Sequence, residues 1–246
     1  MTKILVTNDD GVLAPGIKAL AKALRHEKDT EVIVVAPGQE QSSSSHSITL
    51  DRPLRINKVS KNIYAVEGTP VDSVFMGVWA ILKEKPDFIF SGINRGGNLG
   101  EDLHYSGTVS AAVEGGIMGI PSVAISQLGA NKFNYDKSAA MAVKVYRMLK
   151  KHPLPEGLIL NVNVPQKADL KKISVTKTGK RDYGGKFIEN RDPRGDSYYW
   201  IGGNQYKFED IKNSDCNAIV AGNVSITPIR VDMTAKTYIS KMKKWI

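Results

Sequence analysis

Short apolar runs alternate with segments of helical periodicity along the first two thirds of the chain. Five runs rich in β-branched or bulky apolar residues predict buried strands, at 4–6, 32–35, 88–90, 121–125 and 158–164. Apolar residues at three- and four-residue spacing predict helices between them, beginning at Pro15, Pro70, Thr108 and Ala139. This alternation favours a doubly wound, mostly parallel sheet with helices on both faces.

The helix that begins at Pro70 has the clearest start signal. Thr69 is suited to cap its N-terminus, and Asp72 lies three residues further on, where a capping box needs a side-chain acceptor. Apolar residues at helical spacing then predict one continuous buried face, made of Val71, Val74, Phe75, Val78 and Leu82.

The pattern changes after Pro165. Glycine, charged residues and short β-like runs such as 173–175 and 224–227 replace the alternation, and the stretch 238–246 predicts a short helix. We therefore expect a single domain over 1–246. Its α/β catalytic core would cover about 1–165, and a β-rich arm of hairpins suited to oligomerisation, with the C-terminal helix, would cover about 166–246.

Composition narrows the class of protein without naming an activity. The chain has 246 residues, of which 41% are hydrophobic and 24% charged, as in ordinary globular proteins. One cysteine, Cys216, excludes an intrachain disulfide and a CxxC site, and no apolar run is long enough to cross a membrane. We expect a cytoplasmic protein. The net charge of +9 lies mostly after residue 150, which fits a solvated surface, attraction of an anionic substrate, or weak nucleic-acid contact.

Polar loops follow the predicted strands, where a doubly wound sheet places its ligands. The first loop, Asn8-Asp9-Asp10-Gly11, holds two adjacent carboxylates. Such a pair is costly at the end of a buried strand unless a cation lies nearby, and hard divalent cations prefer oxygen ligands. Asp9 and Asp10 are equally typical of a turn and a helix cap, so this loop alone leaves both interpretations open.

Three further segments offer oxygen ligands or anion-binding groups. Ser42 lies in a serine-rich loop after the second strand, and Asn94 and Asn98 lie in a glycine-rich loop after 88–90. The segment Tyr105-Ser106-Gly107-Thr108 leads into a helix whose free N–H groups favour an anion, although a serine there is also an ordinary N-cap. Each segment is weak evidence alone. Together they predict a metal-assisted phosphoryl site at one edge of the sheet.

With these motifs in order from residue 3 to about 235, the sequence resembles the SurE (survival protein E) nucleotidase family. The resemblance rests on these segments: Asn8-Asp9-Asp10-Gly11, Ala14-Pro15-Gly16, Val34-Val35-Ala36-Pro37 with Ser42, Gly68-Thr69-Pro70-Val71-Asp72, Ser91-Gly92-Ile93-Asn94, Asn98-Leu99-Gly100, Tyr105-Ser106-Gly107-Thr108-Val109, Asn161-Val162-Asn163-Val164-Pro165, Asp192-Pro193-Arg194-Gly195, Tyr199-Trp200-Ile201-Gly202 and Val224-Ser225-Ile226-Thr227-Pro228. It implies a Rossmann-like core and a divalent-metal-dependent phosphatase acting on nucleoside 5′- and 3′-monophosphates, in some members also on short polyphosphate. It further implies a homodimer or homotetramer.

The resemblance also assigns residues. It implies one Mg²⁺ or Mn²⁺ per subunit, held by Asp9, Asp10, Ser42 and Asn94. It implies phosphate binding by Asn98, Ser106, Gly107 and Thr108. Of these residues we expect Asp9 to guide the attacking water, and Asn98 and Ser106 to stabilise charge in the transition state.

Three positions depart from the family pattern. Ser43 stands where glycine is usual, Asn223 where tyrosine is usual, and His46 where a smaller polar residue is common.

Other classes of protein fit the sequence less well. A phosphatase that forms an aspartyl-phosphate would need Asp-x-Asp after the first strand, and a dinucleotide-dependent oxidoreductase would need G-x-G-x-x-G there. A basic, non-enzymatic nucleic-acid-binding protein would have no use for Asp9 and Asp10. We therefore expect a nucleoside monophosphate as substrate, with no membrane contact and no stable nucleic-acid partner.

Overall fold

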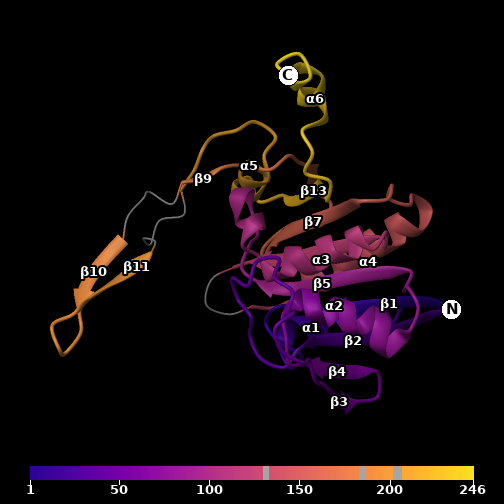
Figure 1. The fold of residues 1–246 in the computed structure, drawn as a ribbon. Coiled ribbons are helices and arrows are strands. Elements are labelled where there is room, and N and C mark those ends of the chain that lie inside the picture. The colour runs from indigo at the N-terminus through magenta and orange to yellow at the C-terminus, as the bar shows by residue number, and fades with distance from the viewer. Residues whose placement is uncertain (130–132, 183–186, 202–206) are drawn as a thin grey trace.

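One mixed sheet organises the chain (Figure 1). The computed structural model describes residues 1–129, 133–182, 187–201 and 207–246. Within these residues nine strands form the sheet, in the order β3-β4-β2-β1-β5-β6-β7-β13-β8. Their bounds are β1 Thr2–Thr7, β2 Thr30–Pro37, β3 Ile56–Ser60, β4 Ile63–Val66, β5 Phe88–Arg95, β6 Ser122–Leu128, β7 Leu158–Pro165, β8 Ile173–Val175 and β13 Val224–Arg230. Of the pairs within this nine-stranded sheet, β3–β4 and β7–β13 are antiparallel and the others parallel, so the prediction of a doubly wound, mostly parallel sheet is confirmed.

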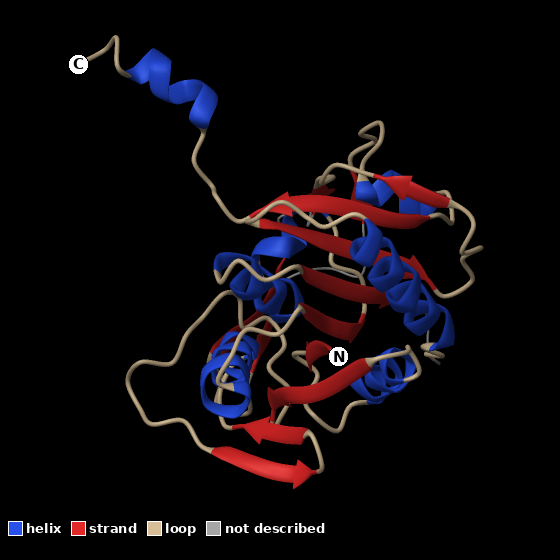
Figure 2. Ribbon diagram, turned by 90° about the vertical axis from the view of Figure 1, so that its right-hand side faces the viewer, coloured by secondary structure: helices blue, strands red, loops and turns tan. Residues whose placement is uncertain are grey.

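Helices cover both faces of this sheet, as Figure 2 shows. One face carries α1 (Pro15–Arg25) and α4 (Asp136–Lys151), which contact each other. The other carries α2 (Pro70–Met76), the π-helical turn η1 (Gly77–Leu82) and α3 (Gly107–Ile117). No described helix has the length and apolarity needed to cross a membrane.

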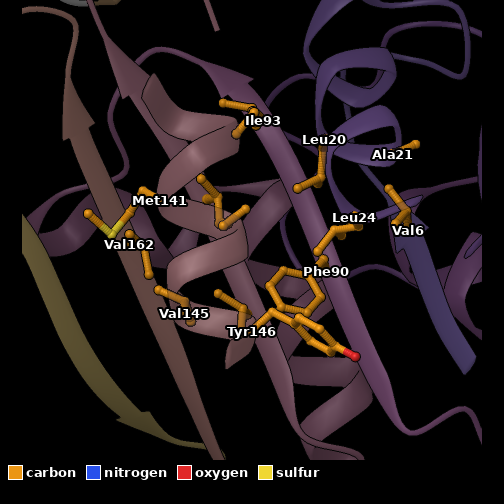
Figure 3. Close-up of a cluster of buried hydrophobic side chains, with 14 of the residues drawn as sticks. Val6, Leu20, Ala21, Leu24, Phe90, Ile93, Met141, Val145, Tyr146 and Val162 are labelled. Carbon is orange, nitrogen blue, oxygen red and sulfur yellow. The ribbon is translucent and has the colours of Figure 1, made fainter. Parts of the chain in front are cut away.

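The larger core cluster lies between the sheet and the α1–α4 layer (Figure 3). Leu20 and Leu24 of α1 and Tyr146 of α4 are at most 1% exposed, and they pack over Phe90 of β5. The Tyr146 ring meets Phe88 edge-on, with centroids 5.4 Å apart. Each such side chain contributes about 1.5–3 kcal/mol through burial, so this layer holds the strand ends in fixed relative positions.

Two helix predictions need correction. The capping box at Thr69 and Asp72 is present, but the α-helix ends at Met76 and the next six residues form a π-helical turn. Val71, Val74 and Val78 are buried as expected, but Phe75, within the α-helical part, is 37% exposed, and Leu82, at the end of the wider turn, is only half-buried. The C-terminal helix α6 spans Lys236–Met242 rather than 238–246, and none of its residues is buried.

The segment after β7 adds two strands to the central sheet and also forms a separate hairpin. Strands β8 and β13 extend the central sheet, whereas β10 (Phe187–Arg191) and β11 (Ser197–Ile201) form a hairpin that projects from it (Figure 1). The remaining elements are β9 Arg181–Asp182, β12 Lys207–Phe208, the 3-10 turn η2 Gly100–His104 and α5 Asp215–Val220. Gly202, part of one motif above, lies outside the described residues. The division into a core and an arm near residue 165 stays a prediction.

Candidate active site

The carboxyl ends of β1 and β5 meet the N-terminus of α3 beside a pocket of about 700 Å³. β1 lies between β2 and β5, so the order of the strands reverses at β1. A doubly wound sheet binds its ligands beside such a switch point, at the carboxyl ends of the strands. The pocket is lined by Asp9, Ser42, Ser43, Asn94, Arg95, Gly97, Asn98, Asp102, Tyr105, Ser106, Arg181 and Ile201.

Five of the eight residues predicted for the site line this pocket: Asp9, Ser42, Asn94, Asn98 and Ser106. The other three lie within two residues of Asp9 or Ser106 in the chain, and they do not line it: Asp10, Gly107 and Thr108. Segments that are far apart in the sequence are therefore brought to one place.

Asp9 follows β1 and is 5% exposed. Its carboxylate accepts a hydrogen bond from the hydroxyl of Thr108, in the first turn of α3. Burial raises the pKa of Asp9 above its ordinary value, against the opposing effect of that hydrogen bond. The Thr108 hydroxyl thus orients Asp9. The sequence predicted phosphate binding for Thr108 instead.

Asp10 is half-buried beside Asp9. Burial, followed by repulsion from the Asp9 carboxylate, raises the pKa of Asp10 to about 6. Arg95 opposes the rise through its backbone N–H and its charge, but does not cancel it. Nearby, Asn8 has a buried Oδ1 with no hydrogen-bond partner among the described residues. Two carboxylates that resist ionisation, in a set of oxygen donors, fit a hard divalent cation.

Ser42 and Asn94 supply the neutral oxygens. Ser42 donates its hydroxyl to Glu40 at 2.6 Å, and Asn94 donates Nδ2 to the carbonyl oxygen of Gly96 at 2.9 Å. Among the described residues, no three His, Cys, Asp or Glu side chains are grouped so that they could hold a metal ion. The donors near this pocket are thus the two aspartates and these neutral oxygens.

The N-terminus of α3 forms the opposite side of the site. Ser106 is its N-cap and accepts a hydrogen bond from the backbone N–H of Val109 at 3.1 Å, so the ordinary capping role holds. A Cβ on Gly107 would approach the Cβ of Asp9 to 2.9 Å. Glycine therefore lets the helix start lie against the Asp9 loop, where its backbone N–H groups can meet an anion.

Comparison with known proteins decides the family. The model of the family described as Survival protein SurE matches residues 4–185. The chain belongs to the SurE family. It is 48% identical to "5'-nucleotidase SurE" of Geotalea uraniireducens (strain Rf4), over 99% of this chain and 98% of that protein. The SurE protein of the same name from Geobacter sulfurreducens (strain ATCC 51573 / DSM 12127 / PCA) is 48% identical, over 98% and 93%. The crystal structure of the SurE protein from Aquifex aeolicus matches with a TM-score of 0.89 and 39% identity, covering 99% of each chain.

The three residues that depart from the expected family pattern each have a defined local setting. Ser43 has a φ of 59°, the left-handed region that glycine adopts most easily, so serine keeps the backbone of the usual residue at some cost. His46 lies 2.9 Å from Glu114 of α3 and ties the serine-rich loop to that helix. Asn223 donates Nδ2 to the Ser174 hydroxyl at 3.2 Å.

The pocket wall also contains an ion pair that the sequence does not predict. Arg181 of β9 pairs with Asp102 of η2, and each side chain is 12% exposed. Glu101 accepts a hydrogen bond from the backbone N–H of Arg181 at 2.7 Å. The basic excess after residue 150 was the only signal, and it could not single out Arg181. The pair joins the β-rich segment to the mouth of the SurE site.

Proposed function

We propose that this SurE protein is a 5′-nucleotidase that hydrolyses nucleoside 5′- and 3′-monophosphates to nucleoside and phosphate. The supporting observation is the convergence of Asp9, Ser42 and Asn94 with the start of α3 in one pocket. Short polyphosphate is a second substrate of the same chemistry. Family membership, with relatives named 5′-nucleotidase over nearly their full length, supports the reaction class.

One Mg²⁺ or Mn²⁺ would be held by Asp9, Asp10, Ser42 and Asn94. When bound there, such an ion supplies Lewis acidity toward a phosphoryl oxygen and lowers the pKa of a bound water. The donor set supports this assignment, since two mutually repelling carboxylates are paired with neutral oxygens and Arg95 only partly offsets their charge.

The protein's own groups then have distinct tasks. Asp9, oriented by Thr108, directs a water toward phosphorus opposite the leaving oxygen. Asn98 and the helix start at Ser106 bind phosphoryl oxygens and stabilise the charge that develops on them. Because Gly107 has no side chain, the start of α3 can lie against the Asp9 loop, so its backbone N–H groups can reach the phosphoryl group beside Asp9.

Assembly and location complete the proposal. Large apolar side chains of the hairpin are exposed, among them Phe187, Trp200 and Ile201, at 63%, 64% and 97%. An exposed apolar hairpin supports a homodimer or homotetramer assembled through this arm. We also propose that the enzyme works in the cytoplasm without a stable nucleic-acid partner.

A phosphate-release panel tests the proposal. It covers 5′- and 3′-nucleoside monophosphates and short polyphosphate, each with Mg²⁺, Mn²⁺ or a chelator. We expect release from monophosphates with metal and none with chelator. Asp9→Asn should lose at least about 100-fold in kcat/KM, whereas Asp51→Asn, which neutralises an exposed carboxylate, should change little. Full activity of folded Asp9→Asn, or metal-independent release, would refute the assignment.

A further inference from the structure

We propose that Asn163, together with Asn161 and Ser126, positions Asn98 in the active site. The inference rests on the proposed function, because it concerns the residue assigned to bind the phosphoryl group. None of the three contacts the pocket. They act through Asn98 and are therefore positioning residues, for which neither the family comparison nor the pocket lining gives a role.

The contacts form a clamp around a single residue. Asn163 accepts a hydrogen bond from the backbone N–H of Asn98 at 2.9 Å and donates Nδ2 to its carbonyl oxygen, also at 2.9 Å. Asn161 donates a second hydrogen bond to that carbonyl at 2.9 Å. Ser126 accepts from Nδ2 of the Asn98 side chain at 2.7 Å. Backbone and side chain of Asn98 are thus both fixed.

The strand register makes this arrangement possible. Ser126 of β6 lies directly opposite Asn163 of β7, and Asn161 lies two residues earlier on β7, on the same face. Strands in the middle of a parallel sheet normally carry apolar residues. All three positions are fully buried, so uncharged polar side chains here are unfavourable unless their hydrogen bonds are needed.

One buried atom favours a role for the clamp beyond stability. Oδ1 of Asn161 has no hydrogen-bond partner among the described residues. An unsatisfied buried oxygen destabilises the folded state, and an apolar residue at 161 would avoid that cost. The sheet keeps an asparagine whose side chain donates its hydrogen bond to Asn98.

The clamp leaves a donor available for substrate. A carboxamide Nδ2 carries two hydrogens, and Ser126 accepts one of them. The second can serve a phosphoryl oxygen, since Asn98 lines the pocket. Gly100 lies two residues after Asn98, and its backbone N–H donates a hydrogen bond to Asp215 at 3.0 Å. This contact fixes the next part of the loop. Loss of the clamp should therefore misplace the donor.

A double-mutant cycle separates positioning from stability. We expect Asn163→Ala to lower kcat/KM for a nucleoside 5′-monophosphate by about 10- to 100-fold. The same change in an Asn98→Ala background should add less than about 2-fold, because the group that it positions is gone. Thermal stability should fall by a similar amount in both backgrounds. Weaker competitive inhibition by inorganic phosphate should accompany the loss in Asn163→Ala.

Ser126→Ala and Ser225→Ala provide the milder variant and the matched control. Ser126→Ala removes only the side-chain acceptor of Asn98, and should lower kcat/KM by about 10-fold even if Asn163→Ala does not fold. Ser225→Ala removes a buried hydroxyl from β13, which bonds to Thr176 at 2.7 Å rather than to Asn98, and should leave kcat/KM within about 2-fold.

The outcomes distinguish the inference from its premise. If the wild-type protein releases no phosphate from any nucleotide, the proposed function fails. If Asn98→Ala retains full activity, the role of Asn98 fails. If Asn98→Ala is impaired while Ser126→Ala and a folded Asn163→Ala match Ser225→Ala, the positioning inference alone is overturned, as it is if the losses are additive with Asn98→Ala.

Discussion

Asp10→Asn should stabilise the metal-free protein at neutral pH while impairing catalysis. Burial and the Asp9 carboxylate raise the pKa of Asp10 from 3.8 to about 6. The fold therefore favours the protonated carboxyl, and an ionised Asp10 destabilises it. The rise corresponds to about 3 kcal/mol before screening. Because Asp10 is only half-buried, solvent reduces the expected gain of Asp10→Asn to about 1–2 kcal/mol.

The stability difference between Asp10→Asn and wild type should depend on pH. Wild type gains stability, relative to Asp10→Asn, as the pH falls from about 6 toward 3.8, because the folded state binds a proton that the unfolded state does not. The advantage of Asp10→Asn should thus be complete above about pH 6 and vanish near pH 4. Urea unfolding with a chelator at several pH values measures it.

The same stability measurement with added metal should give the opposite order. At 100 times the dissociation constant, a bound ion should stabilise wild type by about 2.7 kcal/mol. Asp10→Asn should gain much less, so the order of stability should reverse. The reasoning is refuted if Asp10→Asn is no more stable than wild type at pH 8 with chelator, or if the difference is the same at pH 4.

Three further substitutions test packing, a buried hydroxyl and an ion pair. Gly16→Ala should cost about 2–3 kcal/mol in urea unfolding, because its Cβ would overlap the carbonyl oxygen of Ile93; a value below 1 would contradict this. Tyr146→Phe should leave stability unchanged or raise it by up to about 1 kcal/mol, since the buried hydroxyl has no partner among the described residues; clear destabilisation would show a missed hydrogen bond. Asp102→Asn should cost about 3 kcal/mol in thermal unfolding, because it removes the charge paired with the buried Arg181; a neutral result would mean that the pair is screened.

The sheet and its helices follow from the sequence because their signals are local. Apolar runs, a capping box at Thr69 and helical periodicity each lie within a few residues of one another. Positions after the predicted strands then indicate that Asp9 and Asn94 lie at the same sheet edge, although β5 extends to Arg95 and Asn94 belongs to the strand rather than to a loop. Leu82 shows the limit, since it lies in the π-helical turn after Met76, and the switch from α- to π-helical winding has no local sequence signal.

What sequence reasoning missed depends on contacts across long separations. Asp102 and Arg181 lie 79 residues apart in the sequence, and Asn98 and Asn163 lie 65 residues apart. Asn163 was noticed only as part of a motif on a strand, where an apolar residue would be ordinary. Its purpose becomes visible only when β7 is placed beside β6 and the loop after β5.

The position of β13 has a consequence for synthesis on the ribosome. This strand covers the outer side of β7, yet residues 166–223 must be made between the two. At 5–20 residues per second, β7 presents an open hydrogen-bonding edge for roughly 3–12 s. An apolar strand with such an edge can recruit a strand from another chain. Nascent chains on one messenger are therefore most vulnerable to mispairing during this interval, and slower translation of 166–223 would lengthen it.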